Sequence, residues 1–342
     1  MILQHGVRLE QQKTPSLKQK IQALPVPAEL AASKPLAPRQ GKLDAAGIVA
    51  AAEAANIVDE FDGAPLFQKL KRMRRLRVKT ILACCFDEDP YTSSAMATLR
   101  ENTDAIIAGL VLAAKACGAQ ENKIAVATAH EARVIKRINP QADLVIAGER
   151  YPARVLLKQK LRYSGETTAY IGAQACAALT MAVDNGRAQD FTVVTVAGDA
   201  VEDWRNVKVR IGVPLQFVLD ACEVSPKTKI VITGSSVTGK AVMDLSQPVT
   251  ATTRCVIAMK KTPRNRTYPC IGCQKCARAC PRGIRPWLVY HEMKRDRPDP
   301  LRLQNVQKCI GCATCSVACP SGIDLGGAVA KAAELKKSGD FN

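Results

Sequence analysis

Near its carboxyl end the sequence reads Cys270-Ile-Gly-Cys273-Gln-Lys-Cys276-Ala-Arg-Ala-Cys280-Pro281, and it repeats this phrase as Cys309-Ile-Gly-Cys312-Ala-Thr-Cys315-Ser-Val-Ala-Cys319-Pro320. Both copies have the spacing C-x2-C-x2-C-x3-C-P, which holds cubane iron–sulfur clusters in bacterial proteins with two such clusters. Three thiolates at this spacing wrap a short loop around one cluster. The repeat therefore predicts two [4Fe-4S] clusters and one-electron chemistry in the last part of the chain.

The fourth cysteine of each copy is predicted to ligate the cluster of the other copy, as in two-cluster ferredoxins. It lies where the chain leaves the loop, and the proline after it redirects the backbone because proline fixes φ and lacks an N–H. The predicted ligands of cluster I are Cys270, Cys273, Cys276 and Cys319, and those of cluster II are Cys309, Cys312, Cys315 and Cys280. We expect Ile271, Ile310 and Val317 to supply an apolar shell around the clusters.

Two other interpretations of the cysteines fit less well. A disulfide framework needs an oxidising compartment, and we expect no signal peptide in this chain. Zinc needs four ligands per site rather than two overlapping sets of four. The remaining cysteines are predicted to be buried, inert thiols: Cys84, Cys85, Cys117, Cys176, Cys222 and Cys255. So many free thiols predict a reducing compartment, such as the cytoplasm of an anaerobe.

The chain has 342 residues, 47% of them hydrophobic, which is enough for buried cores in two or three domains. No uninterrupted apolar stretch reaches the length of a membrane-spanning helix. We therefore expect a cytoplasmic protein, with peripheral binding at the inner face of the cell membrane as a further option.

The formal net charge is +18, and two oxidised clusters with their eight thiolates would lower it to about +14. Such a protein can bind nucleic acid, an anionic membrane or an acidic protein. Because the basic–aromatic interleaving typical of nucleic-acid binding is missing, we expect an acidic redox protein (a ferredoxin, flavodoxin or flavoprotein) and no nucleic acid. The densest basic run, Lys69-Leu-Lys71-Arg72-Met-Arg74-Arg75-Leu-Arg77, is either a solvated helix face or a docking site.

Upstream of the cysteine motifs, strands alternate with helices, a pattern typical of a parallel sheet covered by helices. The expected strands are 78–85, 123–127 and 144–147, and the expected helices are 104–116 and 131–138. Strands dominate the following region, which indicates a small α+β module of the β-grasp kind. Its expected strands are 191–196, 208–211, 229–232 and 255–258, with one helix over 214–222.

The first 45 residues are expected to form an extension. Thr14-Pro15 is a plausible helix start, and Leu17, Ile21 and Leu24 form an apolar stripe, so a short helix and then a proline-rich linker are predicted. Further helices are expected over residues 44–57 and 325–337, and the segment 286–305 is expected to hold Trp287 and Tyr290 on a helix.

The ordered set of segments resembles RnfC, the peripheral subunit of the ion-pumping ferredoxin:NAD oxidoreductase, and more distantly the NADH-binding subunit of respiratory complex I. Beside the cysteine motifs, the resemblance is carried by Leu24-Pro-Val-Pro-Ala-Glu-Leu30, Ile81 to Tyr91 with its end Asp87-Glu-Asp89-Pro-Tyr91, Thr195-Val-Ala-Gly198 through Gly212-Val-Pro-Leu215, and Pro248-Val-Thr250.

The resemblance implies an α/β fold: a Rossmann-like parallel-sheet domain, a soluble-ligand-binding β-grasp (SLBB) module and a helical two-cluster ferredoxin-like domain. The implied boundaries are 1–60 for an extension that is a remnant of the family's N-terminal domain, 61–188 for the parallel-sheet domain, 189–260 for the SLBB module and 261–342 for the cluster domain.

Family members usually carry a Gly-Gly-Ala-Gly-Phe-Pro-Thr loop that binds FMN, whose glycines let the backbone approach the phosphate. This chain has Asp62-Gly63-Ala64-Pro65-Leu66-Phe67 there and keeps one glycine, so FMN and NADH binding stay open. The resemblance assigns Asp87, Asp89 and Gly63 to the flavin or nucleotide region. Alternatively, the two acids only stabilise the positive end of a helix dipole.

The sequence thus predicts an electron-transfer subunit that relays single electrons through two clusters between a redox donor and a partner reductase or membrane complex. Two alternatives remain: a flavin-containing NADH dehydrogenase module, and a dedicated electron donor to a soluble amino-acid or corrinoid reductase. No proton-transfer constellation is visible, so no independent substrate reaction is predicted, and whether the chain is itself an enzyme stays open.

Overall fold

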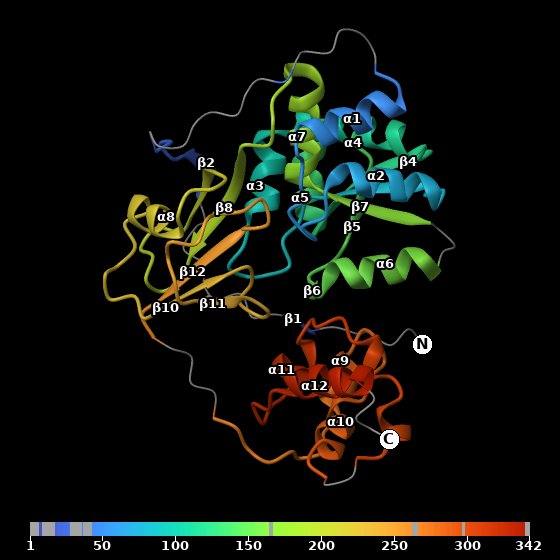
Figure 1. The fold of residues 1–342 in the computed structure, drawn as a ribbon, viewed down its shortest axis with the longest axis vertical. Helices are drawn as coiled ribbons and strands as arrows, with labels where there is room; N and C mark the ends of the chain where they lie inside the picture. Colours follow the sequence, from blue (N-terminus) through green and yellow to red (C-terminus); the bar gives the residue numbers. More distant parts are fainter. Residues whose placement is uncertain are drawn as a thin grey trace. The chain divides into compact units, whose positions relative to one another are not determined.

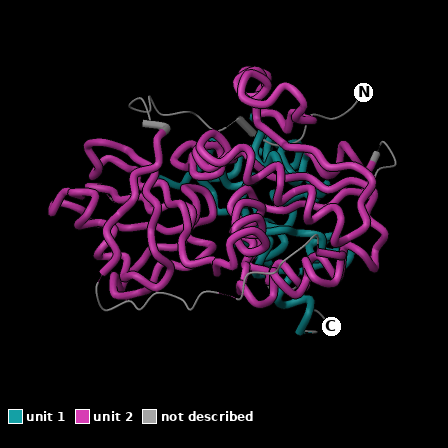
Figure 2. The backbone as a smooth tube through the Cα atoms, turned by 90° about the horizontal axis from the view of Figure 1, so that it is seen from above, with its two compact units in different colours: residues 1–10, 149–156, 262–342 teal, residues 11–148, 157–261 magenta. Residues whose placement is uncertain are grey.

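The computed structural model describes residues 7–8, 18–27, 36, 43–163, 167–261, 266–295 and 298–338. The chain divides into two compact units (Figure 2). One comprises residues 1–10, 149–156 and 262–342 and contains both cysteine motifs, and we call it the cluster unit. The other comprises residues 11–148 and 157–261 and contains both large β-sheets (Figure 1), and we call it the sheet unit.

The first sheet is four-stranded and parallel, in the order β5-β4-β3-β7. Its strands are β3 (Thr80–Cys84), β4 (Glu121–Val126), β5 (Leu144–Ile146) and β7 (Thr168–Gly172). The accompanying helices are α1 (Ala45–Ala54), α2 (Leu66–Arg75), α3 (Ser94–Glu101), α4 (Thr103–Cys117), α5 (Ala129–Ile138), α6 (Ala153–Tyr163) and α7 (Ala173–Asn185). Because neighbouring parallel strands need crossover connections, this alternation is what the sequence predicts, and the predicted parallel sheet is confirmed.

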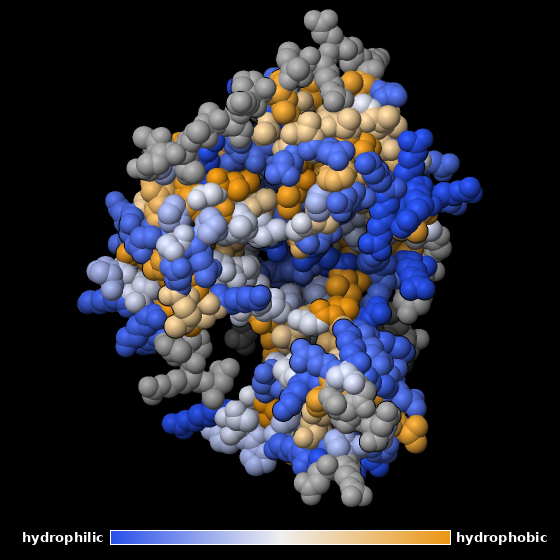
Figure 3. Space-filling view, viewed as in Figure 1, coloured by the Kyte–Doolittle hydropathy of each residue, from blue (hydrophilic) through white to orange (hydrophobic). Residues whose placement is uncertain are grey.

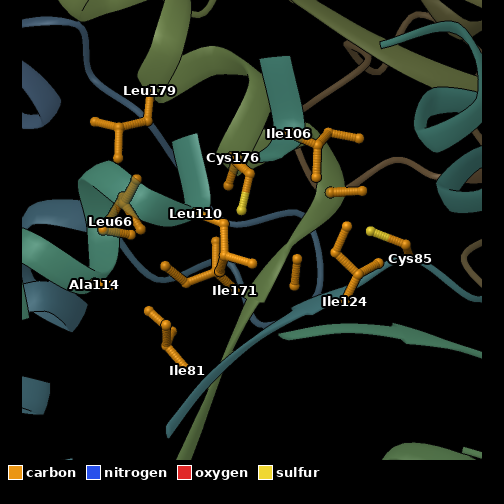
Figure 4. Close-up of a cluster of buried hydrophobic side chains, with 14 of the residues drawn as sticks. Leu66, Ile81, Cys85, Ile106, Leu110, Ala114, Ile124, Ile171, Cys176 and Leu179 are labelled. Carbon is orange, nitrogen blue, oxygen red and sulfur yellow. The ribbon is translucent and has the colours of Figure 1, made fainter. Parts of the chain in front are cut away.

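The core of this sheet consists of small and branched apolar side chains rather than aromatic ones. Helices α4 and α7 pack on each other and both contact β3. Figure 4 shows Leu110, Ile171 and Leu179 in this core together with the thiols of Cys85 and Cys176. All six cysteines outside the motifs are buried, as predicted, and burial raises the pKa of Cys85 and Cys176 well above the usual thiol value.

The second sheet is six-stranded and mixed, in the order β11-β10-β12-β8-β9-β2. Its strands are β2 (Lys18–Ala23), β8 (Phe191–Ala197), β9 (Arg205–Arg210), β10 (Ile230–Thr233), β11 (Lys240–Val242) and β12 (Cys255–Met259), and α8 (Leu215–Ala221) is its helix. Strands β8 and β9 are antiparallel, whereas β12 runs parallel to β8. The four strands and the helix expected in this region are confirmed.

The helix predicted near the amino terminus is wrong over its described part. Residues Lys18–Ala23 form β2, which pairs in parallel with β9, and the N–H of Leu24 donates to the carbonyl of Lys208 at 3.1 Å. Thr14 and Leu17 lie outside the described residues. The exposed edge of β9 offers main-chain hydrogen bonds to this segment, and such tertiary pairing overrides a weak helical pattern.

The cluster unit is built from short helices around the two motifs. They are α9 (Lys275–Ala279), α10 (Pro286–Glu292), α11 (Thr314–Val317), α12 (Leu325–Ser338) and the 3-10 turns Pro300–Leu303 and Val306–Lys308, and a small pair of strands, β1 (Val7–Arg8) and β6 (Arg150–Tyr151), completes the unit. The terminal helix is confirmed. The helix expected to hold Trp287 and Tyr290 within residues 286–305 is confirmed as α10, which ends at Glu292.

Within the described ranges, no helix combines the length and the apolar character that crossing a membrane would require.

Candidate iron–sulfur site

The two cysteine loops have the same backbone conformation. Gly272 and Gly311, which precede the second cysteine of each copy, have φ of +67° and +68°, in the left-handed region that favours glycine. Two residues later, Gln274 and Ala313 also have positive φ, 56° and 52°, although they carry side chains. Each loop then enters a short helix, α9 or α11. The sequence repeat is therefore a structural repeat.

Hydrogen bonds to main-chain carbonyls join the end of each motif to the start of the other. The N–H of Tyr268 donates to the carbonyl of Ser321 at 2.8 Å, and the Ser321 hydroxyl donates to the carbonyl of Pro269 at 2.9 Å. In the other direction, Nε of Arg282 donates to the carbonyl of Lys308 at 3.1 Å. These contacts bring the fourth cysteine of each copy beside the first cysteine of the other.

The first set of four thiols lines a single cavity. Cys270, Cys273, Cys276 and Cys319 line it together with Trp287, Ile323 and Leu325 and with residues of the loops. This is the set predicted for cluster I. Thiolates are the ligands that iron–sulfur clusters use. No three His, Cys, Asp or Glu side chains of the described residues converge on a position for one metal ion.

The second set of thiols is also mutually close. Burial, and then the neighbouring thiols of Cys312, Cys280 and Cys309, raise the pKa of Cys315 to about 12. Burial likewise raises the pKa of Cys280, against the N–H groups of Arg282 and Ile284, which lower it. Cys280 is buried and the other three thiols are partly buried, so four thiolates held this close together are unfavourable. Binding a cluster with a cationic core would offset this cost.

Hydrogen-bond donors already point at several of these sulfurs. The N–H of Gly311 donates to Sγ of Cys309 at 3.4 Å, and the hydroxyl of Thr314 donates to Sγ of Cys312 at 3.0 Å. Donors to sulfur stabilise thiolates and the added charge of a reduced cluster. The donor chemistry, the cavity and the burial together fit two cubanes.

The predicted apolar shell is borne out only for Ile271, which lines the cavity of the first set of thiols. Ile271, Ile310 and Val317 are all exposed, with 71%, 43% and 46% of their surface accessible. The buried shell comes from the segments after the motifs, with Ile323 and Leu325 beside the first set and Ile284, Val289, Leu303, Val306 and Val329 beside Cys280.

The acids at the end of β3 bind main-chain and hydroxyl groups. Asp87 accepts from the N–H groups of Ala95 and Met96 at 3.0 and 3.2 Å, at the start of α3. Burial raises its pKa to about 6, although Arg254, 3.6 Å away, lowers it. Asp87 therefore stabilises the start of α3. This is the second of the two interpretations of Asp87, in place of a role in binding a nucleotide.

Asp89 lies on the same segment but joins a different element. Its Oδ2 accepts from the Ser235 hydroxyl at 2.8 Å and from the N–H and hydroxyl of Ser236 at 2.7 Å each. Asp89 therefore fixes the loop between β10 and β11. Gly63 lies in the turn before α2, with φ +69°.

A pair of acids that the sequence analysis did not single out occupies the start of α7. Glu60 accepts from the N–H groups of Gln174 and Ala175 at 2.8 and 3.2 Å, and Asp59 accepts from the N–H of Gly172 at 3.0 Å. Lys69 pairs with Asp59 at 2.7 Å. A Cβ on Gly172 would overlap the Glu60 carboxylate. The only sequence sign of this arrangement is two adjacent acids before the altered glycine loop.

The position of Glu60 bears directly on FMN. The amino terminus of a helix that follows a parallel strand is where such sheets receive a phosphate, because free N–H groups and the helix dipole favour an anion. Here β7 leads into α7, and buried carboxylates of the chain already take those N–H groups. The residues present at the start of α7 therefore do not fit a phosphate there.

The basic run lies on α2 and just after it. Leu66, Leu70 and Met73 face the core, and Lys69 turns inward to Asp59 and Asp62. The other basic side chains are exposed, and the surface over α2 is strongly hydrophilic (Figure 3): Lys71, Arg72, Arg74, Arg75 and Arg77.

Comparison with known proteins supports the resemblance. Residues 269–323 match the family model described as a 4Fe-4S dicluster domain. The chain is 24% identical over 220 residues to the RnfC-type subunit of the proton-translocating ferredoxin:NAD(+) oxidoreductase complex of Clostridium ljungdahlii, covering 59% of this chain and 48% of that protein. It is 27% identical over 262 residues to the corresponding subunit of the ion-translocating oxidoreductase complex of Pectobacterium atrosepticum, covering 68% of this chain and 38% of that protein.

The chain thus spans less than half the length of these relatives. Among solved structures, an NAD+-reducing [NiFe]-hydrogenase in the H2-reduced state matches with a TM-score of 0.56 at 14% identity, covering 86% of this chain and 61% of that chain. That likeness concerns the fold. The predicted resemblance to RnfC-like subunits, and the mixed α/β fold with a ferredoxin-like 4Fe-4S domain at the carboxyl end, are confirmed.

Proposed function

We propose that the chain is an electron-transfer subunit of an Rnf-like oxidoreductase complex and relays single electrons through two [4Fe-4S] clusters. The observation that carries the proposal is the mutual placement of two sets of four thiols, each drawn from both motifs. Bound cubanes supply the one-electron chemistry. The protein's part is to hold them, to shield them with Ile323 and Leu325 and to direct N–H and O–H donors at the ligating sulfurs.

The remaining assignments belong to the same proposal. Residues 189–260 would be an SLBB module, and residues 61–188 the counterpart of the nucleotide-binding domain of relatives, here without FMN. The donor or acceptor would be an acidic redox protein, which the net charge of +18 and the exposed face of α2 favour. The chain would work in a reducing cytoplasm, bound at the periphery of a membrane complex; the proton translocation in the name of one relative favours the association with a membrane complex.

Cross-ligation gives the sharpest test. In anaerobically reconstituted protein, Cys280→Ser should damage the cluster held by Cys309, Cys312 and Cys315 and spare the other, whereas Cys319→Ser should do the reverse. Iron analysis and electron paramagnetic resonance of the reduced protein measure both effects. Wild-type protein should contain about eight irons per chain.

The matched control is Cys222→Ser, which removes a buried thiol from the sheet unit and should leave the iron content unchanged. Far fewer than eight irons in the wild-type protein, or equal damage to both clusters in each single variant, would reject the proposal.

A further inference from the structure

Trp287 lies beside the thiols assigned to cluster I. It lines the same cavity as Cys270, Cys276 and Cys319, and its main-chain N–H lowers the pKa of the Cys276 thiol, against the burial that raises it. The residue belongs to the first turn of α10, whose leading proline, Pro286, is buried. A rigid helix start therefore holds the indole ring against this cavity.

The indole N–H of Trp287 has no partner within the described part of the chain. Its Nε1 is shielded from solvent, and no acceptor lies within hydrogen-bond distance. The ring meets His291 edge-on, with centroids 6.3 Å apart, which is a ring contact rather than a hydrogen bond. Leaving a buried donor unpaired is unfavourable, so such groups in native proteins nearly always have an acceptor. The cavity that Trp287 lines is where sulfur acceptors would be.

Only one copy of the structural repeat has this tryptophan. Trp287 stands six residues after Pro281, and the residue six after Pro320 is Gly326. Gly326 offers only its main-chain N–H, which donates to the Ser316 hydroxyl at 2.8 Å. The equivalent position beside the second set of thiols therefore has no side-chain donor.

We propose that the indole N–H of Trp287 donates a hydrogen bond to a sulfur of cluster I and raises the reduction potential of that cluster. Reduction adds negative charge to a cluster, and a donor to sulfur stabilises the reduced form more than the oxidised form. Cluster I would then have a higher potential than it would have without the indole N–H. This inference rests on the proposed function, because it requires both clusters to be bound.

The first test is a redox titration of anaerobically reconstituted Trp287→Phe, followed by electron paramagnetic resonance. Phenylalanine keeps an aromatic ring in the cavity wall and removes the N–H. We expect one of the two midpoint potentials to shift to a lower value while the other stays at its wild-type value. Trp204→Phe is the matched control: it removes the indole N–H of the chain's other tryptophan, which lies in the sheet unit, and should move neither potential.

The second test does not depend on any variant. In wild-type protein labelled with indole-15N tryptophan, pulsed paramagnetic resonance of the reduced clusters should detect a 15N coupling. The chain has two tryptophans, and the other, Trp204, donates its Nε1 to the carbonyl of Gly198 at 3.0 Å within the sheet unit. A coupling is therefore assigned to Trp287.

The iron content of the protein distinguishes a failure of the Trp287 proposal from a failure of the electron-relay proposal. With about eight irons per chain, unchanged potentials in Trp287→Phe or the absence of a 15N coupling would overturn the role of Trp287 and leave the electron-relay proposal standing. If wild-type protein binds no cubanes, both proposals fail.

Discussion

Glu60 is a buried acid whose pKa is strongly raised. Burial, and then the adjacent Asp59, raise its pKa from 4.5 to about 7, against the N–H groups of Gln174 and Ala175, which lower it. Between those two pH values the folded protein keeps a proton that the unfolded chain has lost. The free energy of unfolding should therefore fall as pH rises from 4.5 to 7 and stay level above 7.

Glu60→Gln should remove this contribution. Across that window, the difference in unfolding free energy between wild type and variant should change by on the order of 3 kcal/mol. Urea denaturation at stepped pH, followed by circular dichroism, measures it. Asp87, whose pKa is also raised, is present in both proteins and cancels in the difference. Glu53→Gln, at an exposed site, is the control, and an unaltered pH slope in Glu60→Gln would contradict the assignment.

Because of the same carboxylate, we expect no binding of FMN in a titration. Because Glu60 and Asp59 take the N–H groups at the start of α7, a phosphate there would meet negative charge and no free donor. FMN added to wild-type protein should keep its fluorescence unquenched. Riboflavin, which lacks the phosphate, is the comparison ligand. Stoichiometric FMN binding would show that the carboxylates move aside.

At the scale of elements, the packing of α4 on α7 depends on Gly109. A Cβ at this position would overlap the main-chain carbonyl of Cys176. Gly109→Ala should therefore destabilise the sheet unit by about 1–3 kcal/mol, the usual range for overpacking, although alanine is the better helix former. Urea denaturation measures the change.

A substitution at the neighbouring exposed residue, Ala108, distinguishes the effect of helix packing on stability from the effect of helix propensity. Ala108→Gly, the reverse exchange on the solvent side of α4, should cost only about 1 kcal/mol. A Gly109→Ala variant that is more stable than wild type would mean that propensity outweighs the close approach of the two helices.

The elements that the sequence predicted are those with strong local patterns. The cysteine spacing, the apolar strands and the amphipathic helix α5 are encoded over a few neighbouring residues. By contrast, residues Lys18–Ala23 form the strand β2 because they pair with the edge of β9. Helix α7 is built from small residues with little amphipathic pattern. Glu60 could not be foreseen as a helix cap, because its partner N–H groups lie 114 and 115 residues further along the chain.

At the scale of the whole molecule, the two units differ in what stabilises them. The sheet unit has two extended apolar cores, which include Ile106, Leu110, Val194 and Val207. The described part of the cluster unit has short helices and two small groups of buried side chains, several of which are the cysteines themselves. Thiolate–iron bonds should therefore supply a large part of the folding free energy of the cluster unit, as metals do in other small metal-binding domains.

Removal of iron should consequently unfold the cluster unit and leave the sheet unit folded. After anaerobic chelation, checked by iron analysis, hydrogen exchange followed by mass spectrometry should show peptides from 266–295 and 298–338 losing their protection. Peptides from α4 and β8 should keep theirs, because their hydrogen bonds lie within cores that contain no metal ligand. Cluster-unit peptides that stay protected without iron would show that the short helices and their small core suffice, and equal loss in both units would show that the chain unfolds as one cooperative body.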